Sequence, residues 1–225
     1  AVEASQEQVQ KAIANMPGVR IANVNSNKQI ILGGSTLAIQ TANQQLKALG
    51  FTVIPLPISA AFHTEFVKHA QKPFADFIER QKFNRPLIPV YSNTTGNTFP
   101  DDLNALKFIL EEQIMKPVLF KNQIENIYKA GGRVFVEFGP KGVLTKLVGN
   151  ILEDKEHIAI AINPNAKKDS DLQFRQAVIQ LRVLGLPLTN VDPYQKEMPA
   201  LPAVSKMNVK LSGNNYVSEP TKKAY

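Results

Sequence analysis

The sequence contains no cysteine and only three histidines among its 225 residues. Without cysteine the chain can form neither a disulfide nor a zinc or iron–sulfur site with thiolate ligands. The histidines also lack the H-E-x-x-H spacing of a helical zinc site. No apolar run approaches the roughly 18 residues that indicate a membrane-spanning helix. We therefore expect a soluble protein with no metal cofactor and no membrane partner.

The N-terminal residues Ala1–Gln6 lack an initiator methionine, a basic start and the apolar core of a signal peptide. This start predicts that the chain is cut from a longer polypeptide. The absence of a signal and of cysteine is compatible with a cytoplasmic location, which we expect.

The formal net charge of +7 is spread along the chain instead of being concentrated in one segment. A nucleic-acid-binding protein usually gathers its lysines and arginines on one face, so the spread favours an ordinary solvated surface. Residues 132–138 partly match an RNA-recognition signature, but Arg133 stands where a stacking aromatic residue is needed. We expect no nucleic-acid partner. A mildly basic surface would suit an acidic protein or the phosphates of coenzyme A.

Residues 1–58 show the pattern of a small mixed subdomain. Helical periodicity covers residues 3–15, a hairpin joins strands at 19–24 and 29–32, and a helix capped by Ser35 precedes a strand at 51–56. This order is one strand short of the split β-α-β arrangement. We therefore expect a ferredoxin-like subdomain whose first strand is missing.

Residues 59–185 alternate between helices and strands, which predicts an α/β layer fold. Pro73 should kink or break the first of these helices, and the apolar segment 134–138 is typical of a buried parallel strand. The expected helices are 62–81, 103–114, 120–130, 141–152 and 171–184, and the expected strands are 87–92, 134–138 and 157–162. Beyond residue 185, prolines and lysines without periodicity indicate an extended linker over residues 186–225.

Four sequence blocks occur in an order that points to one family. They are Ile21–Ser26, Ser59–His63, Gln113–Val118 and Glu137–Leu144. Together they resemble the C-terminal two-thirds of a malonyl-CoA:acyl carrier protein transacylase, in particular the acyltransferase domain of a type I polyketide or polyunsaturated-fatty-acid synthase. The resemblance covers residues 1–185.

This resemblance implies an α/β-hydrolase-like large subdomain, represented by its C-terminal part at residues 59–185, with the inserted ferredoxin-like subdomain at 1–58. Residues 186–225 would be the linker that follows the domain. In the family, a serine in a G-x-S-x-G turn takes an acyl group from coenzyme A and gives it to the phosphopantetheine thiol of a carrier protein. A nearby imidazole, with a reference pKa near ~6.5, accepts and returns the proton. The chain itself would hold no cofactor.

Three residues match the family's site. His63 corresponds to the catalytic histidine, and Gln113 to the glutamine whose backbone carbonyl holds the ring by its other nitrogen, as the acid does in a Ser-His-Asp triad. Phe62 stands where malonyl-selecting domains carry phenylalanine, which leaves little room for a branched acyl group. In this chain Ala60 replaces the first histidine of the malonyl-type H-A-F-H motif. The alternatives are a packed or surface histidine and an exposed glutamine at a helix end.

The nearest match to the nucleophile turn is Gly33–Leu37, in which Leu37 replaces the last glycine. Ser35 is better explained as a helix N-cap, and we expect the family's serine to precede Ala1. The chain alone should then be an inactive part of an acyltransferase. Its expected partners are acyl carrier protein, acyl-CoA, the N-terminal part of its own domain and a neighbouring ketosynthase domain. The competing hypothesis is a non-catalytic docking or scaffold module of a multidomain synthase.

Overall fold

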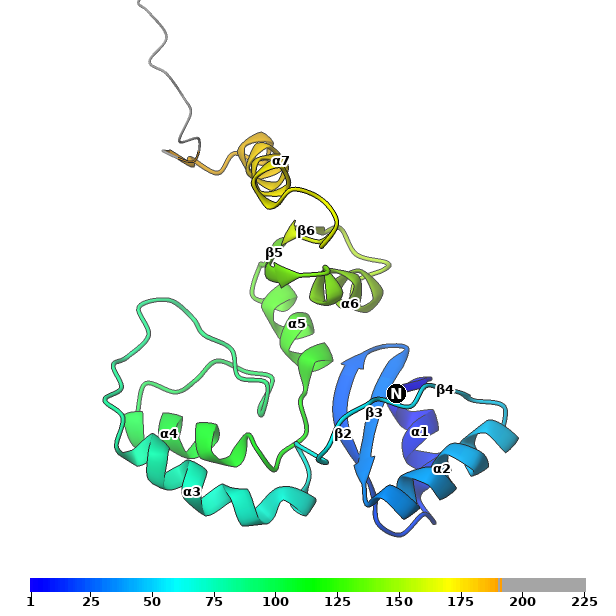
Figure 1. Ribbon diagram of the computed structural model, residues 1–225. Coiled ribbons are helices and arrows are strands. Elements are labelled where there is room, and N and C mark those ends of the chain that lie inside the picture. Colours follow the sequence, from blue (N-terminus) through cyan, green and yellow to red (C-terminus); the bar gives the residue numbers. More distant parts are fainter. Residues whose placement is uncertain (190, 192–225) are drawn as a thin grey trace, which may run out of the picture. The chain divides into compact units, whose positions relative to one another are not determined.

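The computed structural model of the chain describes residues 1–189 and 191 (Figure 1). Residues Ala1–Leu186 form one compact unit. The predicted linker at 186–225 therefore lies almost entirely outside the described residues, and the fold below is that of this unit. Within the described residues no helix is both long and apolar enough to cross a membrane.

The N-terminal part of this unit is a four-stranded antiparallel sheet with two helices. Its strands lie in the order β2-β3-β1-β4. The elements are β1 (Val2–Glu3), α1 (Gln6–Ile13), β2 (Val19–Ser26), β3 (Gln29–Gly34), α2 (Thr36–Ala48) and β4 (Thr52–Val53). This is the β-α-β-β-α-β succession of a ferredoxin-like fold.

The expectation of a missing first strand is wrong. Val2 pairs with Ile30 of β3 on one side and with Val53 of β4 on the other. Two residues are too short to show the alternation by which a strand is predicted from sequence. Helix α1 begins only at Gln6 because Ser5 and Gln8 form a capping box, in which each side chain accepts a hydrogen bond from the other's backbone N–H.

The core of this subdomain lies between the sheet and its helices. Its fully buried side chains are Val2, Val9, Val24, Ile30 and Leu46. They come from β1, α1, β2, β3 and α2, so every long element contributes to one apolar cluster. A cluster shared in this way makes the sheet a firm support for the segment that leaves β4.

The chain then runs through an extended segment into a short 3₁₀ helix η1 (Glu65–Val67), followed by α3 (Lys68–Glu79) and α4 (Leu103–Glu112). Helix α3 continues through Pro73, so of the kink or break expected there the break does not occur. The predicted strand at 87–92 is also wrong, because only Tyr91 makes an isolated bridge, to Thr98. Pro86 and Pro89 lack the N–H groups that a strand would donate.

The C-terminal part of this unit is a parallel α/β arrangement. Strand β5 (Val134–Pro140) pairs in parallel with β6 (Ile158–Asn163), and the strands predicted at 134–138 and 157–162 are confirmed. The helices are α5 (Phe120–Lys129), α6 (Val143–Ile151) and α7 (Ser170–Val183). Side chains of α5 and α6, with Leu152, form a second buried cluster against Phe135 and Ala159. Strand β5 itself is less buried than expected, since Phe138 is 84% exposed.

Backbone and side-chain hydrogen bonds join the two parts. Val24 N–H donates to the Val118 carbonyl at 2.8 Å, and Val118 N–H donates to the Ala22 carbonyl at 2.8 Å. The Asn27 side chain also donates to the Asn150 carbonyl at 3.0 Å, near the C-terminal end of α6. Strand β2 thereby anchors the small subdomain on the segment that leads from α4 to α5.

Candidate functional site

His63 lies in a left-handed backbone conformation, with φ of 65°. Its backbone N–H donates to the Ile114 carbonyl at 2.8 Å, and its ring Nδ1 lies 2.9 Å from the Gln113 carbonyl oxygen. Gln113 is the C-cap of α4, so these carbonyls belong to a helix end that lacks partners within the helix. The backbone and the ring of His63 are thus held by two consecutive carbonyls.

The contact with Gln113 determines which ring nitrogen carries the proton. A carbonyl oxygen can only accept a hydrogen bond, so the neutral imidazole must donate from Nδ1. Nε2 is then unprotonated and able to accept a proton. Nε2 has no hydrogen-bond partner among the described residues. A histidine held in this form has the geometry of a general base.

Thr64 and Gly33 hold the loop that carries His63 in place. The Thr64 side chain is buried, and its hydroxyl donates to the Ala61 carbonyl at 2.6 Å. Thr64 also caps η1, accepting from Phe66 N–H at 3.4 Å. On the sheet side, a Cβ at Gly33 would lie 3.1 Å from Thr64 Cγ2 and 3.3 Å from Ala61 Cβ. The loop therefore packs closely on β3 because position 33 has no side chain.

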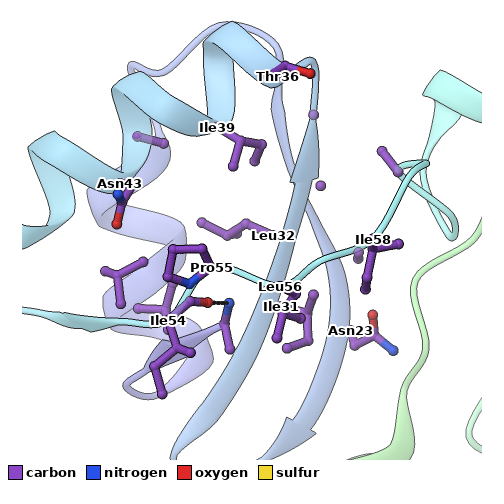
Figure 2. Close-up of a pocket in the computed structure, with 18 of the residues that line it drawn as sticks. Asn23, Ile31, Leu32, Thr36, Ile39, Asn43, Ile54, Pro55, Leu56 and Ile58 are labelled. Carbon is purple, nitrogen blue, oxygen red and sulfur yellow. Dashed lines mark hydrogen bonds between the residues drawn. The ribbon is translucent and has the colours of Figure 1, made fainter.

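His63 and Phe62 line a cavity of about 710 Å³ between the small subdomain and the segment that follows β4. Figure 2 shows Ile39 and Asn43 of α2 on one side of this cavity and Ile54 and Pro55 on the other. Most of the lining is apolar, with a few polar groups. Such a cavity can hold an apolar or weakly polar chain whose reacting end lies beside His63.

The structure brings together the three residues that the sequence singled out. His63 and Gln113 are joined by the contact at Nδ1, and the Phe62 side chain is 47% exposed where it borders the cavity. Ser35 is the N-cap of α2, accepting from Ala38 N–H at 3.3 Å, and does not line the cavity. The prediction that Ser35 is a helix cap is therefore confirmed.

Sequence reasoning missed the residues that support the site. Gly33, near the end of β3, was a usable signal, because a glycine in a strand often marks a close backbone approach. Thr64 before a helical segment was a capping signal. Asn23, on β2, also lines the cavity and lies within one of the four sequence blocks. Nothing in its local pattern distinguishes it from the other asparagines of that hairpin.

Glu137 holds the loop that follows β5. Its carboxylate accepts from the Thr145 N–H at 2.8 Å and from the Thr145 hydroxyl at 2.7 Å. Burial alone would raise the pKa of Glu137, but the hydrogen bonds from Thr145, Leu144 and Val143 outweigh it and hold this pKa below the ordinary value. The carboxylate therefore accepts hydrogen bonds at the N-terminal end of α6.

The described residues contain no group of three or more histidine, aspartate or glutamate side chains able to hold a metal ion. The cavity is lined by His63, an imidazole with an oriented proton acceptor, and Ser59 also lines it. A base of this kind serves a hydroxyl or thiol nucleophile.

Comparison with known protein families shows to which family the chain belongs. The family model of the acyl transferase domain matches residues 1–190. This chain belongs to the acyl transferase domain family. The acyl transferase chain is also 37% identical, over 213 residues, to a polyunsaturated fatty acid synthase polypeptide of a Thraustochytrium species. That alignment covers 92% of this chain and 8% of the synthase polypeptide.

Solved acyl transferase structures share the fold. The malonyl CoA-acyl carrier protein transacylase of Clostridium perfringens matches with a TM-score of 0.73 and 28% identity, covering 82% of this chain and 56% of that one. A malonyl-transacylase in complex with its type II polyketide synthase acyl-carrier protein matches with a TM-score of 0.70 and 26% identity, covering 80% and 56%. The acyl transferase chain thus spans about half the length of these transacylases. The predicted fold, an α/β acyltransferase with a ferredoxin-like subdomain, is confirmed.

Proposed function

We propose that this chain is one part of an acyl transferase that moves a malonyl group from coenzyme A to the phosphopantetheine thiol of an acyl carrier protein. The observation that carries the proposal is the His63 ring, held by Gln113 with Nε2 free at the border of the cavity. The family match and the malonyl transacylases among its structural relatives supply the reaction class.

In the first half-reaction, Nε2 of His63 takes the proton of a serine hydroxyl as its oxygen attacks the thioester carbonyl of malonyl-CoA. The carbon–sulfur bond breaks, the coenzyme A sulfur receives the proton, and an acyl-serine ester remains. In the second, Nε2 takes the proton of the phosphopantetheine thiol, whose sulfur attacks the ester, and the serine leaves with the proton. His63 is unchanged after each half-reaction.

Gln113 acts through His63 as a positioning residue. Its carbonyl keeps the Nδ1–H tautomer in place, so that Nε2 remains the acceptor. The Ile114 carbonyl holds the backbone of the same residue. Because both acceptors are backbone atoms at the end of α4, no side-chain substitution at Gln113 removes the contact directly.

Phe62 selects the acyl group in this proposal. Its ring borders the cavity next to His63, where it would limit the space for a branch on the acyl α-carbon. A single methyl group is worth about 1–3 kcal/mol of discrimination in a pocket, so we expect a preference for malonyl and not an absolute barrier.

We propose that the nucleophilic serine comes from the N-terminal part of the acyltransferase domain, outside this chain. Ser35 caps a helix, and the alignment with the Clostridium perfringens transacylase covers only 56% of that protein. The carrier partner is proposed from the structural relative that was solved with its acyl-carrier protein. The neighbouring ketosynthase domain is proposed because this chain is similar to one part of a polyunsaturated fatty acid synthase polypeptide.

The test uses labelled malonyl-CoA with this chain alone and with the chain joined to the sequence encoded upstream of Ala1. We expect labelling and transfer to a carrier protein only with the joined protein. Joined His63→Ala should transfer about 10²–10⁴-fold more slowly, the usual contribution of a general base. Wild-type turnover by the His63→Ala protein would contradict the assignment of His63.

Ser59 provides the necessary control, because it also lines the cavity. Labelling of the lone chain that disappears in Ser59→Ala would place the nucleophile within this chain and overturn the missing-serine proposal. A joined protein that binds carrier protein but transfers nothing would favour the non-catalytic docking module.

A further inference from the structure

Polar side chains join helices α3 and α4, which lie side by side (Figure 1), at two places. Near the start of α3, Gln71 Nε2 donates to Glu112 Oε1 at 2.9 Å. At the end of α3, Glu79 Oε2 lies 3.1 Å from Lys107 Nζ. The two helices therefore run in opposite directions. Only the contact between Gln71 and Glu112 lies at the end of α4 that holds His63.

Glu112 is the last residue of α4 and closes the turn that follows this helix. Its backbone carbonyl accepts from the N–H groups of Met115 and Lys116, each at 3.0 Å. Gln113 and Ile114, whose carbonyls hold the candidate base, lie inside this turn. A movement of Glu112 would therefore move both carbonyls.

The Glu112 side chain makes one strong contact and one weak one. A carboxylate only accepts hydrogen bonds, so the amide nitrogen of Gln71 must face it, and hydrogen bonds to an ionised group are about twice as strong as neutral ones. The ion pair of Glu112 with Lys116 is long, at 3.6 Å, and the Lys116 side chain is 54% exposed. Ion pairs in contact with water contribute little. Because the Glu112 side chain itself is only 17% exposed, Gln71 is its principal partner.

We propose that Glu112, held by Gln71, is a positioning residue for the His63 base. His63 is connected to α3 through Thr64 and η1, whereas the carbonyls that hold it belong to the end of α4. A shift between the helices at this end would move the acceptor away from Nδ1. Neither Glu112 nor Gln71 lines the cavity, so both act through His63. This inference rests on the proposed function, in which Nε2 of His63 takes the proton of the nucleophile.

The kinetic test uses the chain joined to the sequence encoded upstream of Ala1. Glu112→Ala and Gln71→Ala should each lower kcat about 10- to 100-fold and leave KM for malonyl-CoA within about two-fold, because small misplacements of a reacting group are costly. The double variant should be no slower than the slower single variant, since both changes remove the same contact. Glu112→Gln keeps an oxygen that accepts from Gln71 and should recover most of the rate.

Lys107→Met is the matched control. It removes the other polar contact between α3 and α4 but keeps most of the apolar stem of the side chain. Its kcat should equal that of the wild type, even where its melting temperature falls as far as that of Glu112→Ala.

Nitrogen NMR of this chain alone supplies a measurement that a purely structural contact would not change. The hydrogen bond at one ring nitrogen of a histidine decides which nitrogen carries the proton. The wild type and Lys107→Met should therefore show His63 as the Nδ1–H form, whereas Glu112→Ala and Gln71→Ala should show a rise in the Nε2–H form.

Three results would overturn the proposal: a kcat of Gln71→Ala within about two-fold of the wild type, an equal loss of kcat in Lys107→Met, or an unchanged His63 tautomer in Gln71→Ala. Gln71→Ala decides the matter even where Glu112→Ala fails to fold. A joined protein that transfers no malonyl group would contradict the proposed function, while the tautomer of His63 in the variants would still decide whether Glu112 and Gln71 position the ring.

Discussion

Replacing Thr64 by valine tests whether the His63 loop is held as the structure indicates. Valine has nearly the shape of threonine but lacks the hydroxyl, so the Ala61 carbonyl would lose the donor that now lies 2.6 Å away. The Thr64 side chain is also the cap of η1, and the residue is only 2% exposed. Leaving a buried polar group without a partner costs about 1–3 kcal/mol.

This cost predicts a measurable loss of stability. For a chain of 150–250 residues, 1 kcal/mol lowers the Tm by about 2–4 °C, so Thr64→Val should melt about 2–12 °C below the wild type. Thr64→Ser keeps the hydroxyl and should recover most of the loss. Because the sequence contains no tryptophan, the melt is best followed by far-ultraviolet circular dichroism. Equal melting temperatures for the valine and serine variants would refute the reasoning.

Three further substitutions, one of them with a matched control variant, test other parts of the account. Gly34→Ala should destabilise the small subdomain, because its Cβ would clash with the Gly18 carbonyl oxygen. Gly139→Ala, with no atom within 4 Å of its Cβ, should melt close to the wild type. Glu137 has a lowered pKa in the folded chain, so its carboxylate stabilises the fold above its ordinary value of 4.5, and this contribution disappears as the pH falls through the folded value. Denaturant titrations should therefore show a steeper loss of stability at acid pH for the wild type than for Glu137→Gln. In the joined protein, Phe62→Ser should raise the rate with methylmalonyl-CoA relative to malonyl-CoA by about 5- to 100-fold, and an unchanged ratio in a competition assay would remove Phe62 from acyl selection.

The sequence predicted the long elements well and the short ones poorly. The hairpin of β2 and β3, the cap at Ser35 and the existence of strands β5 and β6 could be predicted from local residue patterns, whereas the pairing of β5 with β6 could not. Strand β1 escaped prediction because two residues carry no periodicity, and its pairing with β3 and β4 depends on contacts distant in sequence. The apolar segment at 87–92 looked like a strand, but its prolines prevent pairing.

The candidate site could be predicted only in part from the sequence. His63, Gln113 and Phe62 were found through a family resemblance, and periodicity alone would have placed His63 inside a helix. The left-handed backbone at His63 depends on packing between β3 and the loop, which no local pattern encodes. The exposed side of β5 was also unexpected, since an apolar strand is normally covered on both faces.

The central claim is that α4 holds His63 as the Nδ1–H tautomer, with Nε2 free to accept a proton. At pH 9 an imidazole ring is ordinarily uncharged. Nitrogen NMR of the rings at this pH shows directly which of the two ring nitrogens carries the proton. The signals of His63 would be assigned by their loss in His63→Ala. The account predicts a protonated Nδ1 and an unprotonated Nε2 for His63, whereas a dominant Nε2–H form would contradict it.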